Sequence, residues 1–186
     1  MALFSRWRAE RELKRKAERY VATLMAEPGL DDVNWLASQA TRGDMDHARW
    51  ELRYAKRALG LLAAQRDALD DRTGSVVART LDEAFARDAN IATDMLDVAE
   101  RQFNARLAAY RDVLGARGGG ALQPRLGQTL FAFAGGAFRH VDDNITRAGA
   151  LVSGYLAEAN AALRDAFGAA SLPENVSPSS LASGKR

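Results

Sequence analysis

The amino-acid sequence predicts an all-α protein, an elongated antiparallel bundle of three long helices preceded by a basic amphipathic helix. Two observations carry this prediction. Apolar residues recur every three and four positions over long stretches, which is the period of a helix with one buried face. Segments typical of turns, containing glycine, proline or aspartate, separate those stretches. The predicted bundle covers residues 31–168, with helices over about residues 31–70, 75–115 and 125–168.

Residues 1–27 form the predicted N-terminal helix. At about 100° per residue, its apolar side chains fall on one arc and several arginines line the other side. The arc contains Leu3, Leu13, Ala17, Tyr20, Val21 and Leu24, and the other side contains Arg8, Arg11, Arg15 and Arg19. Residues 1–19 carry seven basic and three acidic side chains, so the rest of the chain is slightly acidic. Pro28 and Gly29 are expected to end this helix.

The first long helix, residues 31–70, is expected to begin at Asp31 or Asp32, since either aspartate is a suitable N-terminal cap. Residues 41–44, Thr-Arg-Gly-Asp, predict a kink or a short break within it. The helix is expected to end at a turn over residues 71–74. Ser75 is the predicted cap of the helix that follows.

The other two long helices have matching apolar stripes and are separated by three glycines, so they are expected to be antiparallel. Residues 126–167 repeat apolar or small side chains over five heptads, and we expect this segment to organise the rest of the chain. One heptad position contains Phe131, Phe138, Ile145, Val152, Ala159 and Ala166, and the other contains Ala134, Val141, Ala148, Tyr155 and Ala162. Residues 169–186, which include two prolines and five serines, predict a mobile tail.

Composition narrows the function classes. The chain has 186 residues, no cysteine and a net charge of +2, which excludes disulfides, thiolate metal sites and cysteine nucleophiles. No apolar run approaches the roughly 18 residues of a membrane span. The near balance of charge makes nucleic acid an unfavoured partner. These features predict a cytoplasmic protein, either soluble or peripheral to the inner face of the membrane.

One segment resembles a metal-binding pattern. Asp44, His47 and Glu51 share a helix face, and carboxylate-x-x-His is the spacing at which ferritin-like di-iron bundles present their ligands. Such a centre needs a second copy of the motif. The only other histidine, His140, has Ala137 three residues before it, so the pattern is incomplete. We therefore predict no metal and no cofactor, and we keep this site as an alternative.

Nucleophilic and phosphate-binding motifs are missing from the sequence. No serine lies in a Gly-x-Ser-x-Gly turn, and the three glycines at 118–120 are not followed by the Lys-Ser/Thr of a phosphate-binding loop. The sequence therefore favours a protein that is not an enzyme.

The resulting hypothesis is a non-enzymatic accessory or scaffolding protein. It would dock on the protein subunits of a larger assembly, as a peripheral subunit at the cytoplasmic face of a membrane complex, and an anionic membrane surface is a further expected partner. The predicted contact residues are Leu3, Phe4, Trp7, Arg8, Arg11, Arg15 and Arg19. Three alternatives remain open: a ferritin-like metal-carboxylate enzyme, a nucleic-acid-binding helical module, and an N-terminal helix that simply docks on its own bundle.

Overall fold

The computed structural model describes residues 2–67, 71–116, 121–137 and 142–168, with side chains from Trp7 onward. These residues form helices and no strand, which confirms the all-helical prediction. The α-helices are α1 (Ala2–Met25), α2 (Leu30–Gln39), α3 (Met45–Asp67), α4 (Asp71–Ala86), α5 (Leu96–Gly115), α6 (Leu122–Phe133) and α7 (Asp143–Phe167), and a short 3-10 helix, η1 (Thr93–Met95), precedes α5. The tail predicted over residues 169–186 lies outside the described residues.

The prediction of three long helices is wrong, because each predicted helix is two shorter ones. The break expected at residues 41–44 is confirmed: Arg42 and Gly43 adopt φ angles of 57° and 88°, which no α-helix accommodates. The Asp44 carboxylate then accepts the His47 main-chain N–H at 2.9 Å and begins α3. The chain therefore reverses here, and α2 and α3 pack against each other.

The break between α4 and α5 was not predicted. The Asp88 carboxylate accepts the main-chain N–H of Asn90 at 3.0 Å and its side-chain amide at 2.8 Å. In addition, the Ile91 N–H bonds to the Asp88 carbonyl at 2.9 Å. Short-range bonds of this kind satisfy the backbone without a helix, and they end the predicted 75–115 helix at its middle.

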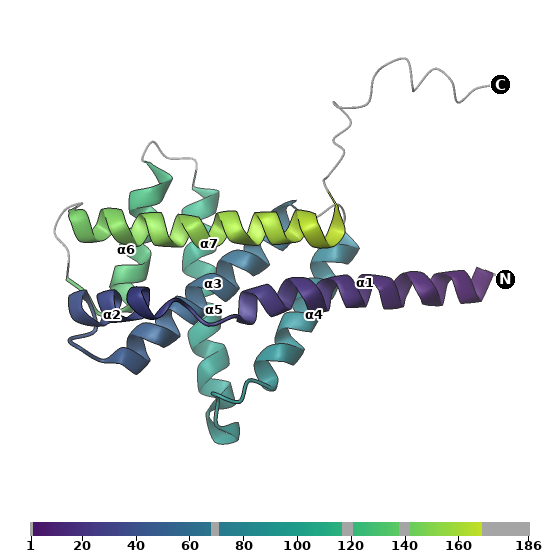
Figure 1. Ribbon diagram of the computed structural model, residues 1–186, viewed down its shortest axis with the longest axis horizontal. Coiled ribbons are helices and arrows are strands. Elements are labelled where there is room, and N and C mark those ends of the chain that lie inside the picture. Colours follow the sequence, from purple (N-terminus) through teal and green to yellow (C-terminus); the bar gives the residue numbers. More distant parts are fainter. Residues whose placement is uncertain (1, 68–70, 117–120, 138–141, 169–186) are drawn as a thin grey trace, which may run out of the picture.

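The third predicted helix is broken between α6 and α7. Gly135 has a φ of 79°, and the Asp142 carboxylate accepts the Ile145 N–H at 2.9 Å as the N-terminal cap of α7. Phe138 and Val141, two of the predicted heptad residues, lie outside the described residues. In Figure 1, α6 and α7 cross each other steeply instead of continuing one another.

Two predicted helix starts are also wrong. Gly29 is the residue before α2 and no side chain caps that helix, while Asp31 and Asp32 lie in its first turn, where a carboxylate interacts favourably with the helix dipole. The predicted turn at residues 71–74 is the first turn of α4. Ser75 lies inside α4, and its hydroxyl donates to the Asp71 carbonyl at 2.8 Å.

The helix at the centre of the fold is α3, not the predicted 126–167 segment. It packs against each of the other six α-helices that the structure describes. Every residue from 51 to 64 is buried, so α3 has no solvent-facing side over almost four turns. In Figure 1 it lies behind α7 and α1, among the remaining helices.

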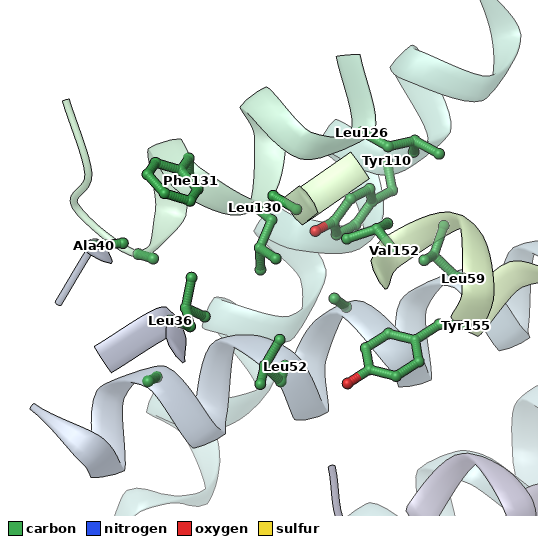
Figure 2. Close-up of a cluster of buried hydrophobic side chains, with 14 of the residues drawn as sticks. Leu36, Ala40, Leu52, Leu59, Tyr110, Leu126, Leu130, Phe131, Val152 and Tyr155 are labelled. Carbon is green, nitrogen blue, oxygen red and sulfur yellow. The ribbon is translucent and has the colours of Figure 1, made fainter. Parts of the chain in front are cut away.

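The buried apolar side chains form one large and two smaller clusters. The large cluster joins α2, α3, α5, α6 and α7, and Figure 2 shows part of it. It contains six of the predicted heptad residues, among them Phe131 and Val152, together with Leu52 and Leu59 of α3. A second cluster joins the C-terminal half of α1 to α3, α4 and α7.

Two glycines set how closely α6 and α7 approach. A Cβ atom on Gly127 would lie 2.2 Å from the Ile145 carbonyl oxygen, and one on Gly149 would lie 2.3 Å from the Gln123 carbonyl oxygen. The atoms in the way belong to the backbone, which has little freedom to shift. The crossing of α6 over α7 therefore depends on the absence of side chains at these positions.

The N-terminal helix α1 has two parts: a docked half, residues 17–25, and a free half, residues 2–16. In the docked half, Tyr20 and Leu24 are buried and pack against α3. The Tyr20 hydroxyl donates a hydrogen bond to the Gly60 carbonyl at 2.7 Å. Burial raises the pKa of the Tyr20 hydroxyl. This half is therefore part of the core, in line with the alternative that the N-terminal helix docks on its own bundle. The free half extends beyond the other helices in Figure 1.

Two deletions should separate these halves. A protein lacking residues 2–12 should unfold cooperatively at nearly the temperature of the full chain, because the described side chains it loses are all exposed. Deleting residues 2–26 removes Tyr20, Val21 and Leu24, each of which contributes about 1.5–3 kcal/mol by burial, so most of the stability should be lost. Thermal unfolding followed by circular dichroism tests both expectations. Equal melting temperatures for the two deletions would contradict the docked half.

Candidate functional site

The most prominent exposed feature is a face of the free half of α1. Trp7, Arg8, Arg11 and Arg15 fall within an arc of about 100° on the helix, and we call them the arginine–tryptophan face. Trp7 is 54 % exposed, although tryptophan is usually well buried. The guanidinium of Arg11 lies over its ring, 4.3 Å from the centroid. An exposed aromatic ring surrounded by arginines is therefore presented to solvent.

Much of the positive charge on this face is uncompensated. Arg15 donates to both carboxylate oxygens of Glu12, at 2.9 and 3.1 Å, and this lowers the pKa of Glu12 and raises that of Arg15. Neither Arg8 nor Arg11 pairs with a carboxylate in the described part of the chain. Two guanidinium groups thus remain for an anionic partner.

One of the predicted contact residues has hydrogen-bond partners on another helix of the chain. Arg19 donates to the carbonyls of Asp165 and Ala166, at 2.9 and 3.3 Å, so it satisfies the C-terminal end of α7. Its role in the structure is to hold α1 and α7 together. The side chains of Leu3 and Phe4 lie outside the described part of the structure.

A cleft of mixed charge lies between the free half of α1 and α4. It has a volume of about 440 Å³ and is lined by Glu10, Leu13, Lys14, Arg72, Ser75, Val76, Arg79, Thr80 and Glu83. Arg72 pairs with Glu10 at 3.2 Å, and Lys14 lies 3.8 Å from Glu83. Exposed pairs of this kind contribute little to stability, but they orient α1 along α4.

The predicted metal-binding pattern is occupied by protein groups. Asp44 caps α3, as described above, and the buried Glu51 forms a two-pronged ion pair with Arg106 of α5. His47 Nε2 lies 3.4 Å from the same carboxylate. Within the described ranges, no group of three histidine or acidic side chains has a metal-binding arrangement. Glu51 is therefore the counter-ion of Arg106, and a metal ion would have to displace that arginine.

Sequence reasoning missed a set of buried charges on α3. Arg57 is 1 % exposed and bonds to the Asp88 carboxylate at 2.7 Å. Arg53 forms a two-pronged pair with Glu27 at 2.8–3.1 Å, and Lys56 pairs with Glu158 at 3.2 Å. The sequence around these residues does not distinguish them from charged residues on a solvent-exposed helix face, because each ion-pair partner comes from a distant segment.

Among these, the Arg57 pair has the most unusual environment. Its Nε and Nη1 atoms are buried and have no hydrogen-bond partner among the residues that the structure describes. The centroids of the Phe85 and Trp50 rings lie 5.3 and 5.8 Å from the guanidinium carbon. Burial lowers the pKa of Arg57. Burial alone would raise the pKa of Asp88, but hydrogen bonds from Asn90 and Arg57 lower it. The pair is therefore ionised, and it fastens the α4–α5 connection to α3.

No family model, curated protein or solved structure matches this chain. Within the described residues, no helix is long and apolar enough to cross a membrane.

Proposed function

We propose that this protein is a non-enzymatic accessory or scaffolding protein, and that the arginine–tryptophan face attaches it to a larger assembly at the cytoplasmic surface of a membrane. The observation that carries the proposal is the free half of α1. It extends from the fold with an exposed Trp7 and with two arginines that have no carboxylate partner in the described part of the chain. The charged side chains that are buried in the core form ion pairs within the chain, whereas Arg8 and Arg11 on this face form none with the described residues.

The chemistry of the face matches an anionic membrane surface. Tryptophan is favoured at the boundary between lipid headgroups and hydrocarbon, where its ring is partly apolar and partly polar. Each arginine near an anionic leaflet contributes about 1 kcal/mol of attraction. Because α1 continues into the core through Tyr20 and Leu24, this attachment would position the whole helical body relative to the surface.

The expected result is salt-sensitive binding to anionic vesicles. Changing Arg8, Arg11 and Arg15 to alanine should weaken binding to phosphatidylserine-containing vesicles roughly 100-fold at low salt, since three charges contribute about 3 kcal/mol. Trp7→Ala should weaken binding about 10-fold or more. Co-sedimentation over a range of lipid concentrations measures both effects.

A matched control removes the same charge elsewhere. Arg101, Arg111 and Arg164 are exposed arginines on α5 and α7, and changing all three to alanine should leave vesicle binding nearly unchanged apart from a small effect of net charge. Equal losses in the two triple variants would contradict a specific face. Binding to duplex DNA with a steep salt dependence, in the absence of vesicle binding, would instead favour the nucleic-acid-binding alternative.

A further inference from the structure

An apolar groove lies between α4 and α5. Both helices pack on α3 but make few contacts with each other. The space between them has a volume of about 190 Å³ and is lined by Leu61, Ala78, Leu81, Asp82, Phe85, Glu100, Phe103, Asn104 and Leu107. Small-molecule pockets are typically about 300–1,000 Å³, so this groove has the size for one large side chain.

The edges of the groove are acidic. Asp82 on α4 and Glu100 on α5 lie on its two sides, and neither has a hydrogen-bond or ion-pair partner among the described residues. The floor is apolar and includes Phe85 and Phe103, whose rings are 5.6 Å apart. A suitable occupant therefore combines an apolar or aromatic group with adjacent positive charges.

The chain itself carries such a segment. In the arginine–tryptophan face, Trp7 provides the aromatic ring, and Arg8 and Arg11 provide two charges that no carboxylate of the described residues neutralises. We propose that the α4–α5 groove binds the free half of α1 from a second copy of this protein, with Trp7 in the groove and the arginines facing Asp82 and Glu100. This inference extends the proposed function, because it assigns a protein partner to the same face.

The contact has to form between molecules. The α1 helix packs on the opposite side of α4, where Val76, Thr80 and Glu83 line the cleft beside Lys14. The groove residues Leu81 and Phe85 point to the other side of α4. Since the two complementary surfaces differ, the association is head-to-tail and permits chains of more than two molecules, as expected of a scaffold.

One side chain and two ion pairs bury much less than the 1,200–2,000 Å² of a typical stable interface, so the dissociation constant should be on the order of 100 μM. Sedimentation velocity of the full chain, from about 10 μM to 1 mM, should show a mass that rises with concentration and falls with added salt. Trp7→Ala should weaken this association at least about 10-fold, and Asp82→Asn with Glu100→Gln should do the same.

A mixing experiment tests the geometry. The Trp7→Ala variant keeps its groove and the Asp82→Asn, Glu100→Gln variant keeps its α1 face. At about 100 μM each variant alone should therefore be mostly monomeric, whereas their mixture should form a complex of two molecules and no larger species. Asp97→Asn with Asp112→Asn is the matched control, because it removes two exposed carboxylates of α5 outside the groove and should associate like the full chain.

Several results would overturn the inference: a full chain that stays monomeric to 1 mM, unchanged association in the Trp7→Ala variant, or a mixture of the two variants that remains monomeric. Vesicle binding separates this failure from failure of the proposed function. The groove variant should bind anionic vesicles as the full chain does, since its α1 face is intact. Monomeric protein that binds vesicles would refute the groove alone, and self-association without vesicle binding would refute the membrane attachment alone.

Discussion

Replacing Asp88 with asparagine should lower the free energy of unfolding by about 3 kcal/mol. The variant keeps a carbonyl oxygen that can accept the Asn90 N–H, but it leaves the Arg57 guanidinium charged and buried without a counter-ion. Arg57 already has two buried N–H-bearing atoms without partners, so little else in the structure can compensate. Urea unfolding at pH 7, with the midpoint and slope compared between variant and parent, measures the loss.

The effect should depend on pH in a defined direction. The pKa of Asp88 in the folded protein lies below its ordinary value of 3.8, so the carboxylate contributes stability at neutral pH. That contribution is lost as the pH falls through the lowered folded-state pKa. The stability difference between the parent and Asp88→Asn should therefore be constant above about pH 5 and shrink below pH 4.

A double variant supplies the control. Arg57→Met removes the buried charge. The free energy of unfolding of the double variant, Arg57→Met with Asp88→Asn, should fall by about 1–3 kcal/mol less than the sum of the decreases in the two single variants. Strictly additive losses, or an Asp88→Asn variant within about 0.5 kcal/mol of the parent, would contradict a coupled buried pair.

Replacing Gly127 with alanine should lower the free energy of unfolding by about 2–3 kcal/mol, in spite of the roughly 1 kcal/mol that alanine gains over glycine inside a helix. The added Cβ would lie 2.2 Å from the Ile145 carbonyl oxygen and 2.7 Å from the Gly149 nitrogen. Separating α6 from α7 to admit it also disturbs the packing of Leu126 and Leu130. Gly149→Ala should have a similar effect.

Gly154 in α7 is the matched control, because a Cβ there would meet nothing within 4 Å. Gly154→Ala should raise the free energy of unfolding by up to about 1 kcal/mol. Thermal unfolding of the three variants under the same conditions measures these changes. Stabilisation by Gly127→Ala comparable to that by Gly154→Ala would show that the crossing of α6 and α7 is looser than the structure has it.

Which residues face the core could be predicted from the sequence to a large extent. Apart from Ala162, which is half-buried, every heptad residue of the last segment that the structure describes is buried. The reason is that apolar periodicity records which side of a helix avoids water. This relation does not depend on where a helix begins or ends, so the predicted core residues were correct even where the predicted helix lengths were wrong.

Helix length was predicted less well, because it depends on competition between local hydrogen bonds and helix continuation. The Asp88–Asn90 turn follows α4 and the Asp142 cap begins α7, and in both places the apolar pattern continues across the break. Aspartate and asparagine occur inside helices as well, so their presence in the sequence did not identify these breaks. At residues 41–44, glycine beside a potential cap made the break predictable.

The roles of α3 and α1 follow from contacts between distant segments. The periodicity of residues 51–64 suggested a helix with one buried stripe, yet six neighbours surround it, and Arg57, Lys56 and Glu51 are buried with partners more than 30 residues away. The basic amphipathic character of residues 1–25 was plain in the sequence. The sequence did not show that this helix is divided into a docked half, bonded to Gly60, and a free half with Trp7. Burial of a helix face depends on which other helices pack against it, and only the folded chain determines those neighbours.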